Sequence, residues 1–371
     1  MLNLRLVCSA FACGVLLPAA AAAAPITNVV DRPATQTRLA TSSAMMDVCE
    51  AGTRLVAVGE RGIVLLSDDT GRSWRQASVP VSVSLTAVQF VDARLGWAVG
   101  HSGVVLHSTD GGETWQRQFD GKVAADVAKN AAGQRAAARP DDSAAQRELA
   151  TATQWTQDGP DKPFLGLLFD SAERGFVVGA YGMIFHTSDG GRTWTSWLDK
   201  VPNPDGMHLY AIKRDGRTVY LAGEQGYFAR SDDDGRTFSR LPTPRKVSLF
   251  ALATLPDGGV IVGGLRGNAY RSADRGNTWV PIDLHATDSV SALRVGPDRK
   301  MLMTTQAGGV LRSDGDGREF VGVLSSTLPI NAFSVVDNGG IVMAGPRGVS
   351  RQNLVEAGEA ARSAVPVQGA R

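Results

Sequence analysis

One eight-residue motif organises this sequence: S-x-D-x-G-x-T-W, or a close variant, begins at residues 67, 108, 187, 231, 272 and 313. A short apolar run precedes each copy, and a G-x-x-G turn precedes each run. The turns start at Gly59, Gly100, Gly179, Gly223, Gly264 and Gly345, with a degenerate copy at Thr305, in steps of 41, 79, 44, 41, 41 and 40 residues. A four-stranded propeller blade repeats with about this period, so seven turns predict an all-β, seven-bladed β-propeller.

The single long step, of 79 residues, indicates either a lost blade or an insertion. Residues 122–154 are rich in Ala, Gln, Arg and Glu, which is the composition of helices rather than strands. Pro140 interrupts this stretch, and Asp141 to Ser143 offer an N-cap for a second helix. We therefore expect a helical hairpin inserted in blade three, with an eight-bladed ring as the alternative.

The order of motifs predicts two different faces for the ring. Within a blade, the G-x-x-G turn joins the second strand to the third, and the Asp-containing turn joins the third to the fourth. Successive hairpins of an antiparallel sheet lie at opposite ends, so the two kinds of turn lie on opposite faces. The inserted helices leave from a connection on the G-x-x-G side and should overhang that face. Residues 26–30 are expected to supply the outer strand of blade seven and so to close the ring.

The N-terminus has the layout of a secretory signal peptide over residues 1–24. Arg5 precedes an apolar stretch from Leu6 to Leu17, and small residues follow it. A lipid anchor on Cys13 is the alternative, although the residues before it make a poor hydrophobic segment. We expect an exported, periplasmic protein with the propeller over residues 25–355 and a flexible tail over 356–371.

Charge bears on the partner of the chain, and cysteine content bears on how the fold is stabilised. The chain has 38 Lys and Arg against 37 Asp and Glu, so its overall field gives no reason to expect nucleic acid as a partner. After removal of the signal peptide only Cys49 remains, and one cysteine cannot form an internal disulfide. We expect a monomer whose fold is stabilised by packing alone, without a disulfide.

The residues of the Asp box, as the eight-residue motif is called, suit a structural role. The aspartates can accept hydrogen bonds from backbone N–H groups within the turn, and the closing aromatic residues can pack between blades. The aspartates are Asp69, Asp110, Asp189, Asp233 and Asp274, whereas the sixth copy has Gly315 at this position and should form the weakest turn. A calcium site needs six or more oxygen ligands, which one or two carboxylates per box do not supply. We therefore predict no metal and no cofactor.

The sequence contains no set of residues with the spacing of a known catalytic site. Asp boxes also occur in sialidases and other glycoside hydrolases, which need paired carboxylates or a tyrosine nucleophile. None of the five tyrosines lies in a context that singles it out, and the five histidines lack the i, i+4 spacing of a metal site. No G-x-S-x-G motif or phosphate loop is present. The prediction is a protein that is not an enzyme, with a glycoside hydrolase as the alternative.

Two stretches, LTAVQFVDARLGWAVGHSGVVLHSTDGGETW and GLLFDSAERGFVVGAYGMIFHTSDGGRTW, carry a further signature. An apolar strand ends in F-x-D, and a glycine-led strand, the G-x-x-G turn and the Asp box follow. The chain thereby resembles the photosynthesis system II assembly/stability factor family over roughly residues 45–355. The resemblance implies a scaffold for a membrane protein, located in the thylakoid lumen if the organism is photosynthetic. The helical insertion and the Ala- and Arg-rich composition depart from the photosynthetic pattern and suggest a proteobacterial relative.

The resemblance also implies an arginine patch, and the G-x-x-G turns supply its candidates. Arg61, Arg266 and Arg347 share the third position of their turns in blades one, five and seven. The corresponding turns of blades two, three and four offer His101, Tyr181 and Gln225. Arginine suits bidentate contacts to carboxylates or phosphates, but exposed arginines on turns are also commonly just solvated. We predict that this face binds a membrane protein or envelope complex; an accessory subunit of an envelope transporter is a further alternative.

Overall fold

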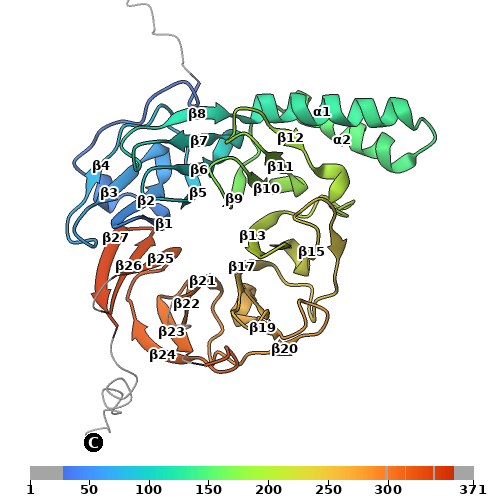
Figure 1. The fold of residues 1–371 in the computed structure, drawn as a ribbon. Coiled ribbons are helices and arrows are strands. Elements are labelled where there is room, and N and C mark those ends of the chain that lie inside the picture. The colour runs from blue at the N-terminus through green and yellow to red at the C-terminus, as the bar shows by residue number, and fades with distance from the viewer. Residues whose placement is uncertain (1–27, 297–299, 314, 337–338, 355–371) are drawn as a thin grey trace, which may run out of the picture.

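The computed structural model of the chain describes residues 28–296, 300–313, 315–336 and 339–354. Seven small antiparallel sheets surround a central axis and form a ring (Figure 1). The predicted all-β, seven-bladed propeller with a helical insertion is therefore confirmed. The predicted signal peptide and C-terminal tail lie outside the described residues.

Each of the first four blades contains four strands in sequence order from the axis outward. Blade one has β1 (Met45–Ala51), β2 (Arg54–Gly59), β3 (Val64–Ser67) and β4 (Arg75–Gln76). Blade two has β5 (Leu85–Phe90), β6 (Gly96–Gly100), β7 (Val105–Ser108) and β8 (Gln116–Phe119). Blade three has β9 (Phe164–Phe169), β10 (Gly175–Gly179), β11 (Ile184–Thr187) and β12 (Thr195–Ser196). Blade four has β13 (Leu209–Asp215), β14 (Thr218–Gly223), β15 (Phe228–Ser231) and β16 (Ser239–Arg240).

The last three blades follow the same order, except that blade seven has three strands. Blade five has β17 (Leu249–Thr254), β18 (Val260–Gly264), β19 (Ala269–Ser272) and β20 (Val280–Pro281). Blade six has β21 (Val290–Val295), β22 (Met301–Thr305), β23 (Gly309–Ser313) and β24 (Val321–Ser325). Blade seven has β25 (Ala332–Val336), β26 (Gly340–Gly345) and β27 (Gly348–Asn353).

The apolar second strand of each blade explains how the ring is held together. Every residue of β6, β10 and β18 is buried, because neighbouring blades cover both faces of the strand. Strands buried on both faces carry continuous apolar runs, and Val and aromatic residues fit that surface. The core therefore consists of apolar layers between adjacent blades rather than one central cluster.

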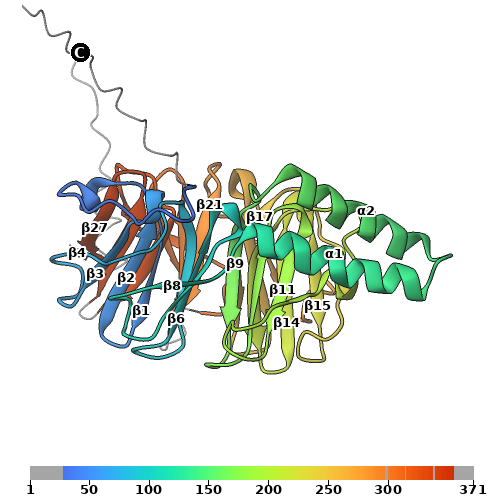
Figure 2. The same ribbon diagram turned by 90° about the horizontal axis from the view of Figure 1, so that it is seen from above.

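The inserted segment is a helical hairpin, formed by α1 (Gly121–Ala138) and α2 (Ser143–Asp158). Asp142 caps α2 by accepting from the N–H groups of Ala144 and Ala145, and α1 ends before Pro140. The base of the hairpin reaches the G-x-x-G side, where a Cβ atom on Gly103 would meet Gly121. From there α1 runs along the outer strand β12, and the hairpin projects away from the ring instead of overhanging its face (Figure 2).

The structure corrects the prediction for ring closure. Residues 28–30 do not form the outer strand of blade seven, and residues 26 and 27 lie outside the described range. The segment lies beside blades one and two instead, where Ser82 N donates to Val29 O at 2.9 Å and Arg117 Nη1 donates to Val30 O at 2.6 Å. Val30 is buried in the apolar layer there, and this burial explains why the segment lies beside these blades.

The ring closes instead through contacts of the inner strands. Arg294 of blade six donates from Nε to Phe333 O in blade seven at 2.6 Å, and from Nη2 to Val48 O in blade one at 2.8 Å. Asn331 of blade seven donates to Met45 O of blade one at 2.9 Å. These side chains join the last blades to the first without a fourth strand in blade seven.

Among the described residues, no helix is both long and apolar enough to cross a membrane.

Candidate functional site

The G-x-x-G turns lie on one face of the ring, which we call the G-x-x-G face. Main-chain bonds fix each turn to its own blade: Glu60 N donates to Ala44 O at 2.9 Å, next to the start of β1. The corresponding bonds in blades two to five join residues 101 and 84, 180 and 163, 224 and 208, and 265 and 248. The predicted separation of the two kinds of turn onto opposite faces follows from this geometry.

The third residue of five turns adopts a left-handed conformation. Its φ lies between 50° and 57° at Arg61, Ser102, Tyr181, Gln225 and Arg266. Such a conformation directs the backbone N–H inward, and three of these groups reach a side chain at the start of the next blade. Tyr181 N donates to His208 Nδ1 at 3.4 Å, Gln225 N to Ser248 Oγ at 3.5 Å, and Arg266 N to Ser289 Oγ at 3.4 Å. Backbone N–H groups of the turn thus make these bonds, and within the described residues the side chains of Arg61, Gln225 and Arg266 form no hydrogen bond.

All six residues predicted for the site are exposed on this face. They belong to six different blades, however, and no contact joins any two of them in the described part of the chain. Two positions differ from the repeat: in blade two the left-handed residue is Ser102, and His101 precedes it. In blade seven the left-handed position is Gly348 rather than Arg347. The six side chains therefore mark a ring of separate positions, not one compact patch.

The three arginines of these turns have no partner within the described residues. The guanidinium groups of Arg61, Arg266 and Arg347 make no hydrogen bond or ion pair there. An exposed guanidinium without a partner keeps all five of its N–H donors available to a ligand.

Around Tyr181 the face carries a cluster that the sequence did not single out. The Tyr181 ring is 52% exposed and lies 5.1 Å from the His208 ring, while Lys162 Nζ lies 5.6 Å from its centroid. His208 Nδ1 lies 3.1 Å from a carboxylate oxygen of Glu224. His208 precedes an inner strand, as do Ser248 and Ser289. Aligning the repeats at this position would have revealed these polar residues.

The inner strands enclose a central cavity of about 1470 Å³. Asp47, Glu50, Lys213 and Arg294 line it, and sequence reasoning did not identify any of them. Burial raises the pKa of Asp47, against the opposing effect of Arg294 and of hydrogen bonds from Val88 N and Val48 N. Single charged residues on different strands have no local sequence signal, because only the ring brings them together.

On the opposite face, each Asp-box turn directs its polar side chains onto itself. In blade three, Asp189 accepts from Thr193 N at 2.9 Å and from the Thr193 hydroxyl at 2.6 Å. Thr187 donates to the same carboxylate and accepts from Gly191 N at 2.8 Å. The same set of bonds recurs around Asp69, Asp110, Asp233 and Asp274. The predicted structural role of these aspartates is confirmed.

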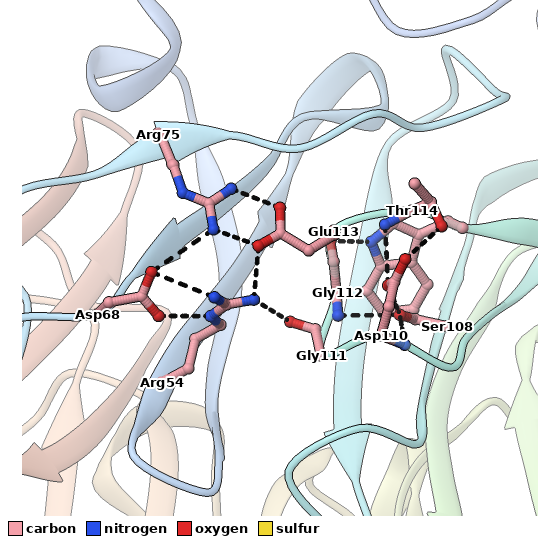
Figure 3. A network of polar contacts seen from close by, with 10 residues as sticks. Arg54, Asp68, Arg75, Ser108, Asp110, Gly111, Gly112, Glu113 and Thr114 are labelled. Carbon is pink, nitrogen blue, oxygen red and sulfur yellow. Dashed lines mark hydrogen bonds and ion pairs between the residues drawn. The ribbon is translucent and has the colours of Figure 1, made fainter.

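Charged residues also join blade one to the Asp box of blade two (Figure 3). Arg54 donates to Asp68 at 2.6 Å and to Gly111 O at 3.1 Å, and Arg75 pairs with Glu113 and with Asp68. The network therefore contains two cations and two anions that satisfy one another. It fastens neighbouring blades and leaves little capacity for a ligand.

The hydrogen bonds of the Asp boxes also shift the acidity of their carboxyl groups. The hydroxyl and backbone N–H of Thr278 lower the pKa of Asp274 to about 2. A carboxylate stabilised in this way belongs to the turn rather than to a reaction. Within the described ranges, no group of three or more His, Cys, Asp or Glu side chains is arranged to hold a metal ion.

Several of the known proteins to which this chain is similar share one name, Ycf48. The curated Photosystem II assembly lipoprotein Ycf48 of Synechococcus sp. (strain CC9902) is 27% identical over 132 residues, which are 35% of this chain and 39% of that protein. The aligned part thus spans well under two thirds of the relative. The solved structure "YCF48 bound to D1 peptide" has a TM-score of 0.61 at 14% identity and covers 88% of this chain and 100% of that one.

The fold is also shared with an enzyme. The glycoside hydrolase GH74 of Niastella koreensis gives a TM-score of 0.62 at 14% identity, over 87% of this chain and 54% of the enzyme. At this identity both structural likenesses show the fold alone.

The family assignment rests on the sequence. The family model for "Photosynthesis system II assembly factor YCF48" matches residues 27–137 and 147–298, which are more than half of the chain. The protein therefore belongs to the photosynthesis system II assembly factor YCF48 family.

Proposed function

We propose that this protein is an exported, non-catalytic propeller that holds a segment of a membrane protein against its G-x-x-G face. Membership of an assembly-factor family supports a binding role, and a solved relative is described as bound to a D1 peptide. The name of the Synechococcus relative as a lipoprotein is consistent with export. The suggestion of a proteobacterial origin stays a prediction.

One observation carries the choice of face: Arg61, Arg266 and Arg347 are exposed at turns whose structure does not need their side chains. Guanidinium groups form strong, charge-assisted hydrogen bonds with carboxylates. Because the arginines lie in different blades, the ligand that fits them is an extended, acidic segment that contacts several turns at once. His101, Tyr181 and Gln225 would provide the contacts of the intervening blades.

The test compares two triple variants of the full-length protein as bait for detergent-solubilised envelope membranes. In the first, Arg61, Arg266 and Arg347 are changed to Glu, and we expect the captured membrane protein to be lost. In the second, Arg192, Arg236 and Arg275 of the Asp-box turns are changed to Glu, and capture should persist. Both variants change the net charge equally, and Arg275 shares the left-handed φ of Arg61 and Arg266. Equal capture by the two variants would refute the proposed face.

A glycoside hydrolase is the second candidate, because a member of that class shares the fold and three carboxylates line the central cavity, those of Asp47, Glu50 and Asp68. All three are engaged: Asp47 accepts from Val48 N and Val88 N, and Glu50 accepts from the Ser334 hydroxyl at 2.9 Å. Asp68 pairs with Arg54. We expect no turnover in a screen of fluorogenic glycosides. Hydrolysis that is lost in Asp47→Asn or Glu50→Gln would establish the enzyme instead.

The remaining alternative is an accessory subunit of an envelope transporter. Such a subunit would co-purify stoichiometrically with the transporter, whereas an assembly factor associates with its partner transiently. Quantifying the ratio of the two proteins after native purification distinguishes the two roles.

A further inference from the structure

The central cavity carries charged side chains that neither the repeat nor the proposed partner-binding face explains. Lys213 of β13 and Arg294 of β21 both line it, from blades four and six. In both inner strands the register with the second strand shifts near the start, just before Ala211 and Ala292. Lys213 and Arg294 each follow that shift by two residues, and they pair with Tyr220 and Leu302 of the second strands. Equivalent positions of the inner strands in a propeller lie at the same height along the central axis, so the two cations lie at one level of the cavity.

The equivalent residue of blade two shows what a side chain normally does at this position. Gln89 of β5 donates to Phe169 O at 2.8 Å and accepts from Phe169 N at 2.9 Å, which joins blade two to blade three. Arg294 likewise bonds to Phe333 O of the next blade. Lys213 differs, because its ammonium group makes no hydrogen bond or ion pair within the described residues, although the side chain is exposed to the cavity.

The charges around Lys213 favour an added anion. Partial desolvation inside the ring and the positive charge of Arg294 lower the pKa of Lys213, against the weaker opposing effect of Asp47. Asp47 is already bonded to two backbone N–H groups and lies 3.6 Å from Arg294 Nη2. Lys300 and Arg312 also line the cavity, and each has interactions within the chain. Among the described residues, the carboxylates that line the cavity are those of Asp47, Glu50 and Asp68, and the partners of each lie elsewhere, so none of them pairs with the Lys213 ammonium group.

Above this level, toward the G-x-x-G face, the wall of the cavity is apolar on one side. Leu165, Tyr210 and Phe250 occupy the second position of the inner strands in blades three, four and five, and all three are half-buried. The rings of Tyr210 and Phe250 lie 5.1 Å apart. Aromatic side chains in this tilted arrangement present faces and edges on which another ring can pack.

We infer that the central cavity is a binding site for a small aromatic carboxylate. Its carboxylate group accepts hydrogen bonds from Lys213 Nζ and from Arg294 Nη1, which has no partner among the described residues. Its ring lies against Tyr210 and Phe250. The site is separate from the proposed partner-binding face, because none of the six residues predicted for that face lines the cavity.

The test is a ligand-observed NMR titration of the full-length protein with phenylacetate as the probe. We expect binding in the millimolar range or tighter, weakened about tenfold or more in Lys213→Met, since hydrogen bonds to charged groups contribute this much. Lys213→Arg should retain most of the affinity. Lys246→Met is the matched control, because Lys246 is exposed outside the cavity, and its affinity should equal that of the wild type.

Two further probes separate the parts of the ligand. Phenylacetamide lacks the charge and acetate lacks the ring, so both should bind the wild-type protein more weakly than phenylacetate. Equal binding of phenylacetate and phenylacetamide, equal binding to wild type and Lys213→Met, or no binding of phenylacetate would each overturn the inference. Membrane-protein capture by Lys213→Met should match the wild type, so that this site and the proposed function can fail independently.

Discussion

The two faces of the ring solve the same problem, a tight turn between strands, in opposite ways. The Asp-box turns hold their shape with side chains: Ser or Thr, Asp and a second hydroxyl bond to one another and to the turn. The G-x-x-G turns hold their shape through bonds of their own backbone groups and through glycine, so the turn does not depend on the side chain of its third residue. A face built from backbone can vary its side chains without losing the fold, and such a surface can acquire a ligand.

The largest effect should come from glycine in a G-x-x-G turn. Gly62 has a φ of 74°, and an added Cβ would lie 2.1 Å from Val81 O. We expect Gly62→Ala to lower the free energy of unfolding by about 3 kcal/mol, from backbone strain and overpacking together. Gly216 also has positive φ, of 55°, but open space around it, so Gly216→Ala should cost only about 1 kcal/mol. Urea unfolding measures both, and equal losses would show that close packing at Gly62 is unimportant.

A smaller loss is expected from the side chains of an Asp box. Asp189→Ala removes an acceptor for Thr193 N, for the Thr193 hydroxyl and for the Thr187 hydroxyl. We expect the free energy of unfolding to fall by about 1.5 kcal/mol, because the carboxylate is partly exposed and water replaces some of these bonds. Asp126→Ala on the surface of α1 is the control, with a change within about 0.5 kcal/mol. A fall no greater than that of the control would remove the distinction between the two kinds of turn.

Much of this contrast could be predicted from sequence, because it repeats. Six copies of the Asp box in phase predicted the blades, the opposite faces and the structural aspartates, which the hydrogen bonds around Asp189 confirm. Features without a repeat were missed. Arg294 closes the ring across two blades, but a single arginine in an inner strand has no periodic signal. The sequence predicts the N-terminal segment as the fourth strand of blade seven, whereas Val30 is buried beside blades one and two.

The irregular Asp box of blade six allows the comparison to be tested by a substitution that should increase stability instead of lowering it. Gly315 occupies the position of the aspartate, and an added Cβ there would meet nothing within 4 Å. Ser313 and Gly317 retain two other positions of the box. We expect Gly315→Asp to raise the free energy of unfolding by about 1 kcal/mol, through new bonds within the turn and reduced entropy of the unfolded chain. Thermal denaturation of Gly315→Asp and Gly315→Ala distinguishes the two contributions, because the alanine variant has the reduced entropy of the unfolded chain but cannot form the new hydrogen bonds.

The smallest effect on stability should accompany the largest effect on binding. Arg61 lies next to Gly62 in the same turn, yet its guanidinium makes no bond within the described residues, so Arg61→Ala should change the free energy of unfolding by less than about 0.5 kcal/mol. Alanine tolerates the left-handed conformation about as well as arginine does, so the backbone term cancels. Capture of the membrane-protein partner should nevertheless weaken, because an arginine that the fold does not use is available to the ligand. A loss of stability comparable to that of Gly62→Ala would show that the side chain belongs to the turn and is not available to a partner on this face.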